Sequence, residues 1–393
     1  SEKIKGDVLL VKTTTGMNVS GIGVKDIIDV RGLPTMMGTD FHDNRPAKRD
    51  AGSVAIMRDA GYVIVGKTVT TELGHRHPGP TRNPHAFDHT PGGSSSGSAA
   101  AVADLMVPLS LGTQTTGSVI RPAAYCGIVG YKPTYNDFDK SGILPNAPSM
   151  DTLGIMARTV QDTLFLRQTL LEEPSDVLKP KPLHGLCFGF LKGPLWLLAE
   201  LETQDLIEDF VGALARKGGR VTEIALEDET KQLLELQRII SSYEFRRSIA
   251  DERINHEPQL SRVLREGRLA DGNQVTNREY QMAIQELINI KLALAKRFYD
   301  IDILVMPSAK GAALTTFLSI AGKYCVLMPN KPLGIKISKK ISNFSERNKL
   351  KTLFKNIKLP KDMGLIIRTA SKDCTPESIK KDFDYVIGIW KTI

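Results

Sequence analysis

The chain has 393 residues, and its 52 Lys+Arg against 44 Asp+Glu give a formal net charge of +8. Hydrophobic residues make up 41% and charged residues 24%, a globular balance that excludes a disordered or fibrous chain. The most apolar stretch, residues 185–199, is interrupted by Lys192 and Pro194, so no membrane span is expected. The first residues lack the apolar core of a secretory signal, and the four cysteines are widely spaced, which together indicate a cytoplasmic protein.

Secondary-structure patterns alternate along the first 309 residues. Helices are expected at residues 50–60, 97–105, 206–217 and 280–299, and strands at residues 62–65, 107–111, 220–225 and 302–306. This alternation predicts an α/β layered domain. Beyond it, residues 315–328 and 364–369 read as strands, residues 329–332 as a turn, and residues 345–355 and 376–390 as helices, which predicts a small α+β segment.

The positive charge is confined to the C-terminal part of the chain. Residues 310–393 hold 17 Lys+Arg and 6 Asp+Glu, a charge of +11, whereas the preceding residues hold 35 and 38, a charge of −3. A composition boundary is therefore predicted, with domains at residues 1–309 and 310–393.

Residues 61–68 match the phosphate-loop pattern G-x-x-x-x-G-K-[ST]. A phosphate loop follows its strand, whereas here the four intervening residues are bulky and form a strand themselves. Nucleotide hydrolysis is therefore the weakest functional hypothesis. What remains is Lys67 at the end of a strand, where α/β folds place functional groups; the alternative is a surface lysine.

Two loops rich in glycine and hydroxyl residues, 91–98 and 112–122, adjoin predicted strands or helices. Such loops can present backbone N–H groups to an anion, and the alternative for either one alone is a flexible turn. Neither contains the G-x-S-x-G pattern of an α/β-hydrolase.

Taken together, Lys67, the Gly-Gly-Ser-Ser run at residues 92–95 and the run at residues 117–134 resemble the amidase signature family. Supporting matches lie at residues 23–26, 50–68, 83–84 and 151–159, so the resemblance covers about residues 20–309. It implies a mixed central sheet flanked by helices, truncated at both ends relative to the family and therefore incomplete. It also implies hydrolysis of a linear carboxamide without a cofactor.

The resemblance implies a catalytic set of Lys67 as base, Ser94 as a serine held by a cis peptide bond, and Ser118 as nucleophile. A serine hydroxyl needs an adjacent base to become a good nucleophile, and a lysine serves as that base when burial keeps it neutral.

The oxyanion of the tetrahedral intermediate would be held by backbone N–H groups of Thr115, Thr116 and Gly117. The chain departs from the family pattern in having Gln114 in place of Asp, Thr116 in place of Gly, and Arg121 one position later than usual.

Four histidines, His75, His77, His85 and His89, lie between Lys67 and Ser94. Their loose spacing and the lack of a clustered acidic partner argue against a zinc site, so no metal is expected. A Ser-His-Asp triad using one of them is a further alternative, which Lys67 makes unnecessary. We expect them to line a substrate cleft.

Residues 310–393 resemble ribonuclease E/G, with matches at residues 319–324, 326–330, 359–370 and 382–390. The resemblance implies a 5′-phosphate sensor made of Gly322, Val326, Arg368 and Thr369, because an arginine fork suits a terminal phosphate. The lysine excess would add salt-dependent attraction to RNA; a solvated basic face is the alternative. That family's carboxylate metal site has no counterpart here, so RNA cleavage is not expected.

The leading hypothesis is thus a serine-dependent amidase acting on a small-molecule amide through an acyl-enzyme. The alternative is a non-catalytic RNA-binding protein that recognises 5′-monophosphorylated RNA. Whether the join is a natural fusion, an engineered one or a mis-joined reading frame is left open, as are the amide substrate and the oligomeric state.

Overall fold

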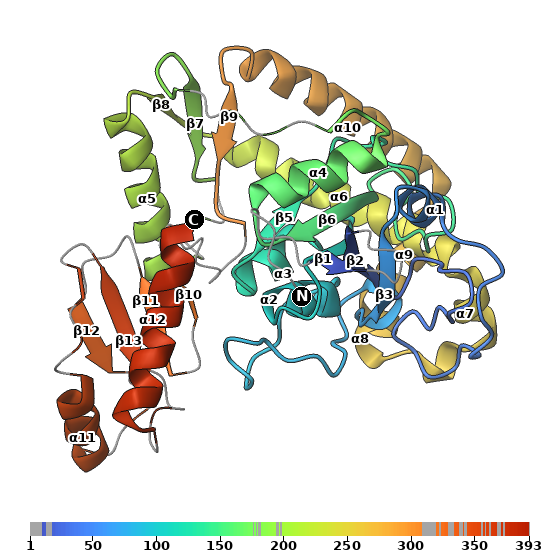
Figure 1. Ribbon diagram of the computed structural model, residues 1–393. Helices are drawn as coiled ribbons and strands as arrows, with labels where there is room; N and C mark the ends of the chain where they lie inside the picture. The colour runs from blue at the N-terminus through green and yellow to red at the C-terminus, as the bar shows by residue number, and fades with distance from the viewer. Residues whose placement is uncertain are drawn as a thin grey trace. The chain divides into compact units, whose positions relative to one another are not determined.

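The computed structural model divides into two compact units, Ser1–Leu314 and Thr315–Ile393 (Figure 1). None of the described helices is long and apolar enough to cross a membrane. The structure describes residues 10–12, 18–175, 182–193, 199–308, 320–321, 324–328, 334–337, 344–354, 363–367 and 374–392, together with residues 177, 179, 196, 341, 357, 359, 360 and 371.

The first unit is organised around a mixed sheet in the order β1-β2-β4-β6-β5, with β3 also paired to β2. Strand β2 runs parallel to β3 and β4, whereas β6 runs antiparallel to β4 and β5. This arrangement confirms the predicted mixed α/β sheet. The strands are β1 (Leu10–Lys12), β2 (Asn18–Lys25), β3 (Val63–Thr68), β4 (Leu109–Gln114), β5 (Val129–Tyr131) and β6 (Thr152–Ala157).

Helices cover both faces of this sheet. One face packs with α1 (Gly52–Asp59) and α4 (Val160–Leu170) around a core that includes Leu153 and Ile155 of β6. The next residue of that strand, Met156, belongs instead to a second core with α2 (Ser96–Ala103) and with Val119 and Cys126, which flank α3 (Ile120–Tyr125). Since successive side chains of a strand point to opposite faces, α1 and α4 lie on one side of the sheet and α2 and α3 on the other.

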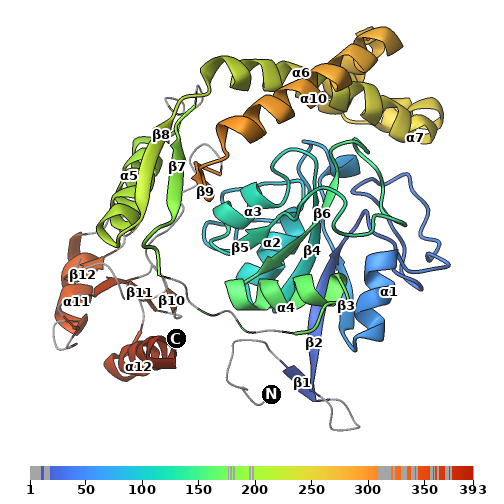
Figure 2. The same cartoon turned by 90° about the horizontal axis from the view of Figure 1, so that it is seen from above.

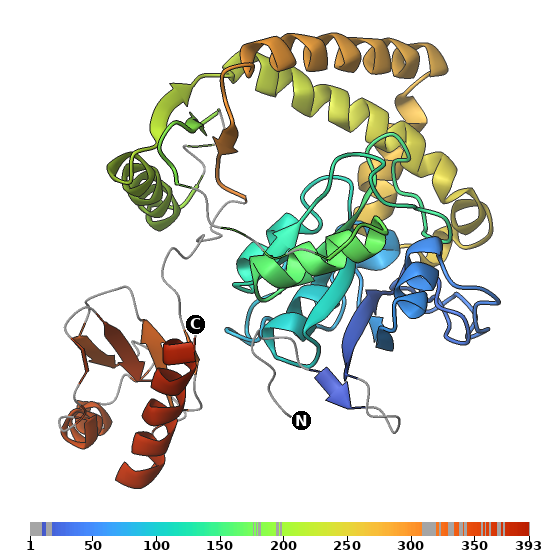
Figure 3. The ribbon, with the colours of Figure 1, turned by 45° about the horizontal axis from the view of Figure 1, so that its top comes forward.

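The remainder of the first unit contains a separate sheet and two long helices. Strand β7 (Cys187–Leu191) pairs in parallel with β8 (Arg220–Ile224) and with β9 (Ile303–Val305). The amphipathic helix α5 (Leu201–Arg216) lies beside β8 (Figure 2). The long helices α6 (Glu227–Ser248) and α10 (Asn277–Arg297) lie side by side (Figure 3).

Short elements fill the connections. They are η1 (Glu72–Gly74), α7 (Ala250–Asn255), η3 (Glu257–Gln259), α8 (Arg262–Leu264), η4 (Arg265–Leu269) and α9 (Ala270–Gln274).

The helices and strands expected in the first unit are all present, with shifted ends. Helix α5 begins at Leu201, five residues before the expected start at residue 206. Strand β3 continues through Gly66, Lys67 and Thr68, so the end of the phosphate-loop pattern is strand and not loop. This confirms the rejection of that motif on physical grounds.

The second unit is a small α+β body with strand order β10-β11-β13-β12. Among its described strands, β12 and β13 pair in parallel, whereas β11 pairs antiparallel with β10 and β13. Its elements are β10 (Ile320–Ala321), β11 (Cys325–Met328), β12 (Gly334–Ile337), α11 (Phe344–Phe354), β13 (Gly364–Ile367) and α12 (Pro376–Thr392). Strand β12 was not predicted, because four residues give too short an alternation; the two helices and β13 were predicted. Of the single strand expected over residues 315–328, residues 315–319, 322 and 323 lie outside the described part of the chain. The described residues form two antiparallel strands, β10 and β11, in place of one.

Candidate active site

A fully buried lysine, Lys25, ends the central strand β2. Its ammonium Nζ donates hydrogen bonds to Ser94 Oγ at 2.7 Å and to Thr113 Oγ1 at 2.8 Å. Thr113 belongs to β4, the parallel neighbour of β2, and Ser94 lies in the loop before α2. The group is therefore assembled where the carboxyl ends of two parallel strands meet a helix-entry loop, the edge at which α/β folds place their sites.

Burial changes the proton affinity of Lys25. Removal from water lowers the pKa of its ammonium from the ordinary 10.5 to about 7, while the negative charge of Asp151 acts in the opposite direction. At neutral pH a large fraction of the side chain is thus a free amine, able to take a proton from the hydroxyl that it contacts.

The backbone around Ser94 is held in place by hydrogen bonds to the carbonyl oxygens of Gly93 and Ser94. The Gly93–Ser94 peptide bond is cis. The carbonyl oxygen of Ser94 accepts the Thr71 N–H at 3.2 Å and the Thr70 hydroxyl at 3.3 Å. The carbonyl oxygen of Gly93 accepts Arg121 Nε and Nη2 at 3.2 and 3.0 Å. These bonds leave the Ser94 hydroxyl directed at Lys25.

Ser118 lies in the turn between β4 and α3 and is 9% exposed. Its carbonyl oxygen accepts the Ser95 N–H at 3.3 Å, which places its segment against the segment of Ser94. Gln114 holds the other side of the turn, because its Oε1 accepts the N–H groups of Val119 and Ile120 at 2.9 and 3.0 Å. In the sequence Gln114 stands out only as a departure from the family pattern, and the structure gives it a positioning contact.

The turn before Ser118 contains the three residues predicted to form the oxyanion hole. Thr115 donates its hydroxyl to Asp151 Oδ1 at 2.5 Å, and the Thr116 hydroxyl accepts Gln237 Nε2 at 3.0 Å. Gly117 has a φ of 78°, a left-handed conformation that favours glycine. Within the described ranges, no hydrogen bond occupies the backbone N–H of Thr116 or Gly117.

The structure does not bring Lys67, the predicted base, into contact with Ser94. The Lys67 ammonium contacts Asp26 Oδ1 at 2.9 Å, the Thr35 hydroxyl at 3.0 Å and the Pro34 carbonyl at 3.1 Å, and Ser94 is bonded by Lys25 instead. The reason is strand register. Lys67 of β3 pairs with Val24, one residue before Lys25, so the two lysines project from opposite faces of the sheet.

The four histidines do not form a metal centre. Nowhere in the described ranges do three His, Cys, Asp or Glu side chains gather as metal ligands would. His85 Nε2 contacts the Cys126 carbonyl at 2.8 Å, His89 contacts Asp88, and His77 is exposed. The His75 ring packs against Phe245, and burial lowers the pKa of His75 to about 3. That these residues line a substrate cleft stays a prediction.

The predicted RNA sensor falls largely outside the described residues. Gly322, Arg368 and Thr369 are not described; Val326 lies in β11 opposite Ile366, and its side chain is not described.

Comparison with known proteins gives two family matches. The amidase family model matches residues 20–324, and the ribonuclease E/G family model matches residues 319–393. The A subunit of glutamyl-tRNA(Gln) amidotransferase from Salinibacter ruber is 40% identical over 226 residues, which are 52% of this chain and 44% of that protein. Its counterpart from Thermus thermophilus is 42% identical over 195 residues, 46% of this chain and 40% of that protein. The chain spans less than half the length of these curated relatives.

Solved structures show the same likeness. A crystal structure of an amidase has a TM-score of 0.67 and 29% identity, covering 77% of this chain and 69% of that one. Native peptide amidase from Stenotrophomonas maltophilia has a TM-score of 0.62 and 25% identity, covering 75% of this chain and 72% of that one. Since the amidase model matches more than half of the chain, the chain belongs to the amidase family.

Proposed function

We propose that the chain is an amidohydrolase that cleaves the C–N bond of a linear carboxamide, with Lys25 as base, Ser94 as proton relay and Ser118 as nucleophile. The observation that carries the proposal is the 2.7 Å hydrogen bond between a fully buried lysine and the hydroxyl of Ser94. Membership of the amidase family and the similarity to solved amidases support the same reaction.

The reaction would proceed in two acyl transfers. Ser118 Oγ attacks the carbonyl carbon of the amide, and its proton passes through the Ser94 hydroxyl to the Lys25 amine. The N–H groups of Thr115, Thr116 and Gly117 stabilise the oxyanion. The C–N bond then breaks, and the leaving nitrogen takes the proton from Lys25 and departs as ammonia or an amine. Water, deprotonated by the same relay, then attacks the acyl-Ser118 ester. The ester C–O bond breaks, the proton held by Lys25 returns through Ser94 to Ser118 Oγ, and the carboxylic acid is released. No cofactor takes part in these steps.

Single substitutions test the assignment. Ser118→Ala and Lys25→Met should each reduce amide turnover by at least a thousandfold, because each removes a member of a unit that acts together. The Ser118→Ala variant should also lose labelling by a serine-directed phosphonate. The proposal fails if the wild type hydrolyses no amide in a broad panel and takes no phosphonate label.

The pH profile tests the base separately. Activity requires neutral Lys25, whose pKa is about 7, so kcat/KM should rise with pH through about that value and level off above it. Steady-state rates measured across this range check the prediction. A profile that is flat between pH 6 and pH 8 would contradict it.

A second candidate function is binding of 5′-monophosphorylated RNA by the second unit, with Arg368 and Thr369 on the terminal phosphate. The ribonuclease E/G match and the charge of +11 on residues 310–393 support this candidate. It predicts tighter binding of 5′-monophosphate than of 5′-hydroxyl RNA, and loss of that difference in Arg368→Met. Equal affinity of the wild type for both RNAs would exclude the sensor. A cytoplasmic location stays a prediction.

A further inference from the structure

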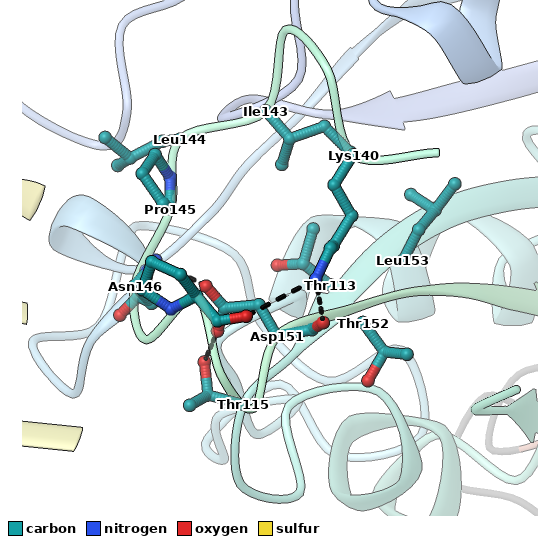
Figure 4. A pocket seen from close by; sticks show the side chains of 11 residues that line it. Thr113, Thr115, Lys140, Ile143, Leu144, Pro145, Asn146, Asp151, Thr152 and Leu153 are labelled. Carbon is teal, nitrogen blue, oxygen red and sulfur yellow. Dashed lines mark hydrogen bonds between the residues drawn. The ribbon is translucent and has the colours of Figure 1, made fainter. Parts of the chain in front are cut away.

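The first unit contains a pocket of about 160 Å³ beside the candidate active site (Figure 4). The ends of strands β4 and β6 form one wall, and the loop of residues 140–148 forms the other. Its apolar lining comes from Ile143, Leu144 and Leu153, with two prolines of the loop. Because a cavity of about 150 Å³ can bind benzene, the pocket has room for about five or six heavy atoms.

Two residues join this pocket to the reacting groups. Thr113 lines the pocket, and its hydroxyl accepts the hydrogen bond from Lys25. Thr115 also lines it and begins the turn that leads to Ser118. A substrate carbonyl held at Ser118 would therefore have one of its substituents within reach of the pocket.

The ammonium group of Lys140, which lines the pocket, is already hydrogen-bonded to protein groups. Lys140 Nζ donates to the carbonyl oxygens of Asp151 at 3.1 Å and Pro148 at 3.4 Å, and it lies 4.3 Å from the centre of the Tyr135 ring. Figure 4 shows the Lys140 ammonium directed towards Asp151 and away from Ile143. A substrate carboxylate would have to displace these contacts.

The carboxylate of Asp151, which also lines the pocket, accepts hydrogen bonds from protein groups. One carboxylate oxygen of Asp151 accepts the Thr115 hydroxyl at 2.5 Å. The other accepts the N–H groups of Asn146 and Ala147 at 2.7 and 2.8 Å. Both charges are thus paired with protein groups, and most of the surface left for a ligand is apolar.

We infer that this pocket receives the acyl side chain of the substrate, and that the preferred substrates are carboxamides with an uncharged, apolar acyl group of about five heavy atoms. The inference rests on the proposed amidase function and adds the substrate class. Desolvation of a carboxylate against these satisfied charges would be unfavourable, whereas burial of each CH₂ would favour the transition state by about fourfold.

The test compares acetamide, isovaleramide and succinamate as substrates of the full chain. For the wild type, kcat/KM for isovaleramide should exceed that for acetamide by at least tenfold, and succinamate should be the poorest of the three. Ile143→Phe fills the pocket and should lower the isovaleramide-to-acetamide ratio by at least tenfold. Ile64→Phe is the matched control, since Ile64 packs against the same core without lining the pocket, and it should keep the wild-type ratio.

Ile143→Ala gives an independent measurement should the larger side chain disturb folding. It enlarges the pocket and should move the preferred substrate from isovaleramide towards hexanamide. A preference for succinamate, or a ratio that neither Ile143 variant changes, would overturn the inference while leaving the amidase proposal intact. Absence of turnover for every amide, together with no phosphonate labelling, would instead refute the proposed function and the inference with it.

Discussion

Replacement of Lys25 by methionine should remove a pH dependence from the stability of the first unit. In the folded chain, burial holds the pKa of Lys25 at about 7, whereas in the unfolded chain it returns to about 10.5. Between these values the unfolded state binds a proton that the folded state does not. The free energy of unfolding of the wild type therefore rises with pH across this window, and is lowest below about pH 7, where both states are protonated.

The magnitude follows from the difference between the two pKa values. That difference corresponds to about 5 kcal/mol in total, at a slope of about 1.4 kcal/mol per pH unit. Relative to Lys25→Met, which carries no charge at any pH, the wild type should gain about 2 kcal/mol between pH 7 and pH 9, since the folded-state lysine is already half deprotonated at pH 7. At acid pH the methionine variant should be the more stable protein, because it buries no charge.

Urea unfolding at a series of pH values measures this difference. Lys67→Met is the matched control, because Lys67 is ion-paired to Asp26 and does not contact Ser94, and its curve should run parallel to the wild type. If the difference between wild type and Lys25→Met stays constant from pH 7 to pH 9, Lys25 keeps its charge in the folded protein. It could not then serve as the base, and the reasoning from burial would be refuted.

Three further predictions concern residues around the site. Lys67→Met should lower the free energy of unfolding by about 1–3 kcal/mol by leaving Asp26 without its ion pair, yet keep the pH profile of amide hydrolysis. A shifted pH profile would contradict the proposal that Lys25, and not Lys67, is the base. Gln114→Ala removes two hydrogen bonds from the turn after Ser118. It should lower kcat about ten- to a hundredfold with little change in KM. An unchanged kcat in steady-state assays would show that Gln114 does not position this turn. Burial raises the pKa of Cys126 to about 12, so iodoacetamide at pH 8 should leave this thiol unmodified until urea unfolds the chain; mass spectrometry would detect alkylation of the native protein if the thiol were accessible.

Much of the fold is encoded locally in the sequence. The 3.6-residue periodicity of segments such as α5 and α10 predicts their helices, and the bulky run Tyr62–Val65 identifies a strand where the motif suggested a phosphate loop. The glycine- and serine-rich loops that carry Ser94 and Ser118 are equally visible, because their composition is local. Short strands such as β12 are not, since four residues carry almost no periodic signal.

The choice of base depends on the tertiary structure. Lys25 and Lys67 both follow apolar, strand-forming residues, and nothing local distinguishes them. The pairing of Lys67 with Val24 determines which of the two lysines contacts Ser94. A shift of one residue between neighbouring strands moves a side chain to the other face of the sheet. Two other features depend on contacts between segments far apart in the chain. They are the burial of Lys25 among β2, β4 and the Ser94 loop, and the pocket. Local sequence therefore identifies the family and the loops that carry Ser94 and Ser118, whereas the strand register determines which lysine contacts Ser94.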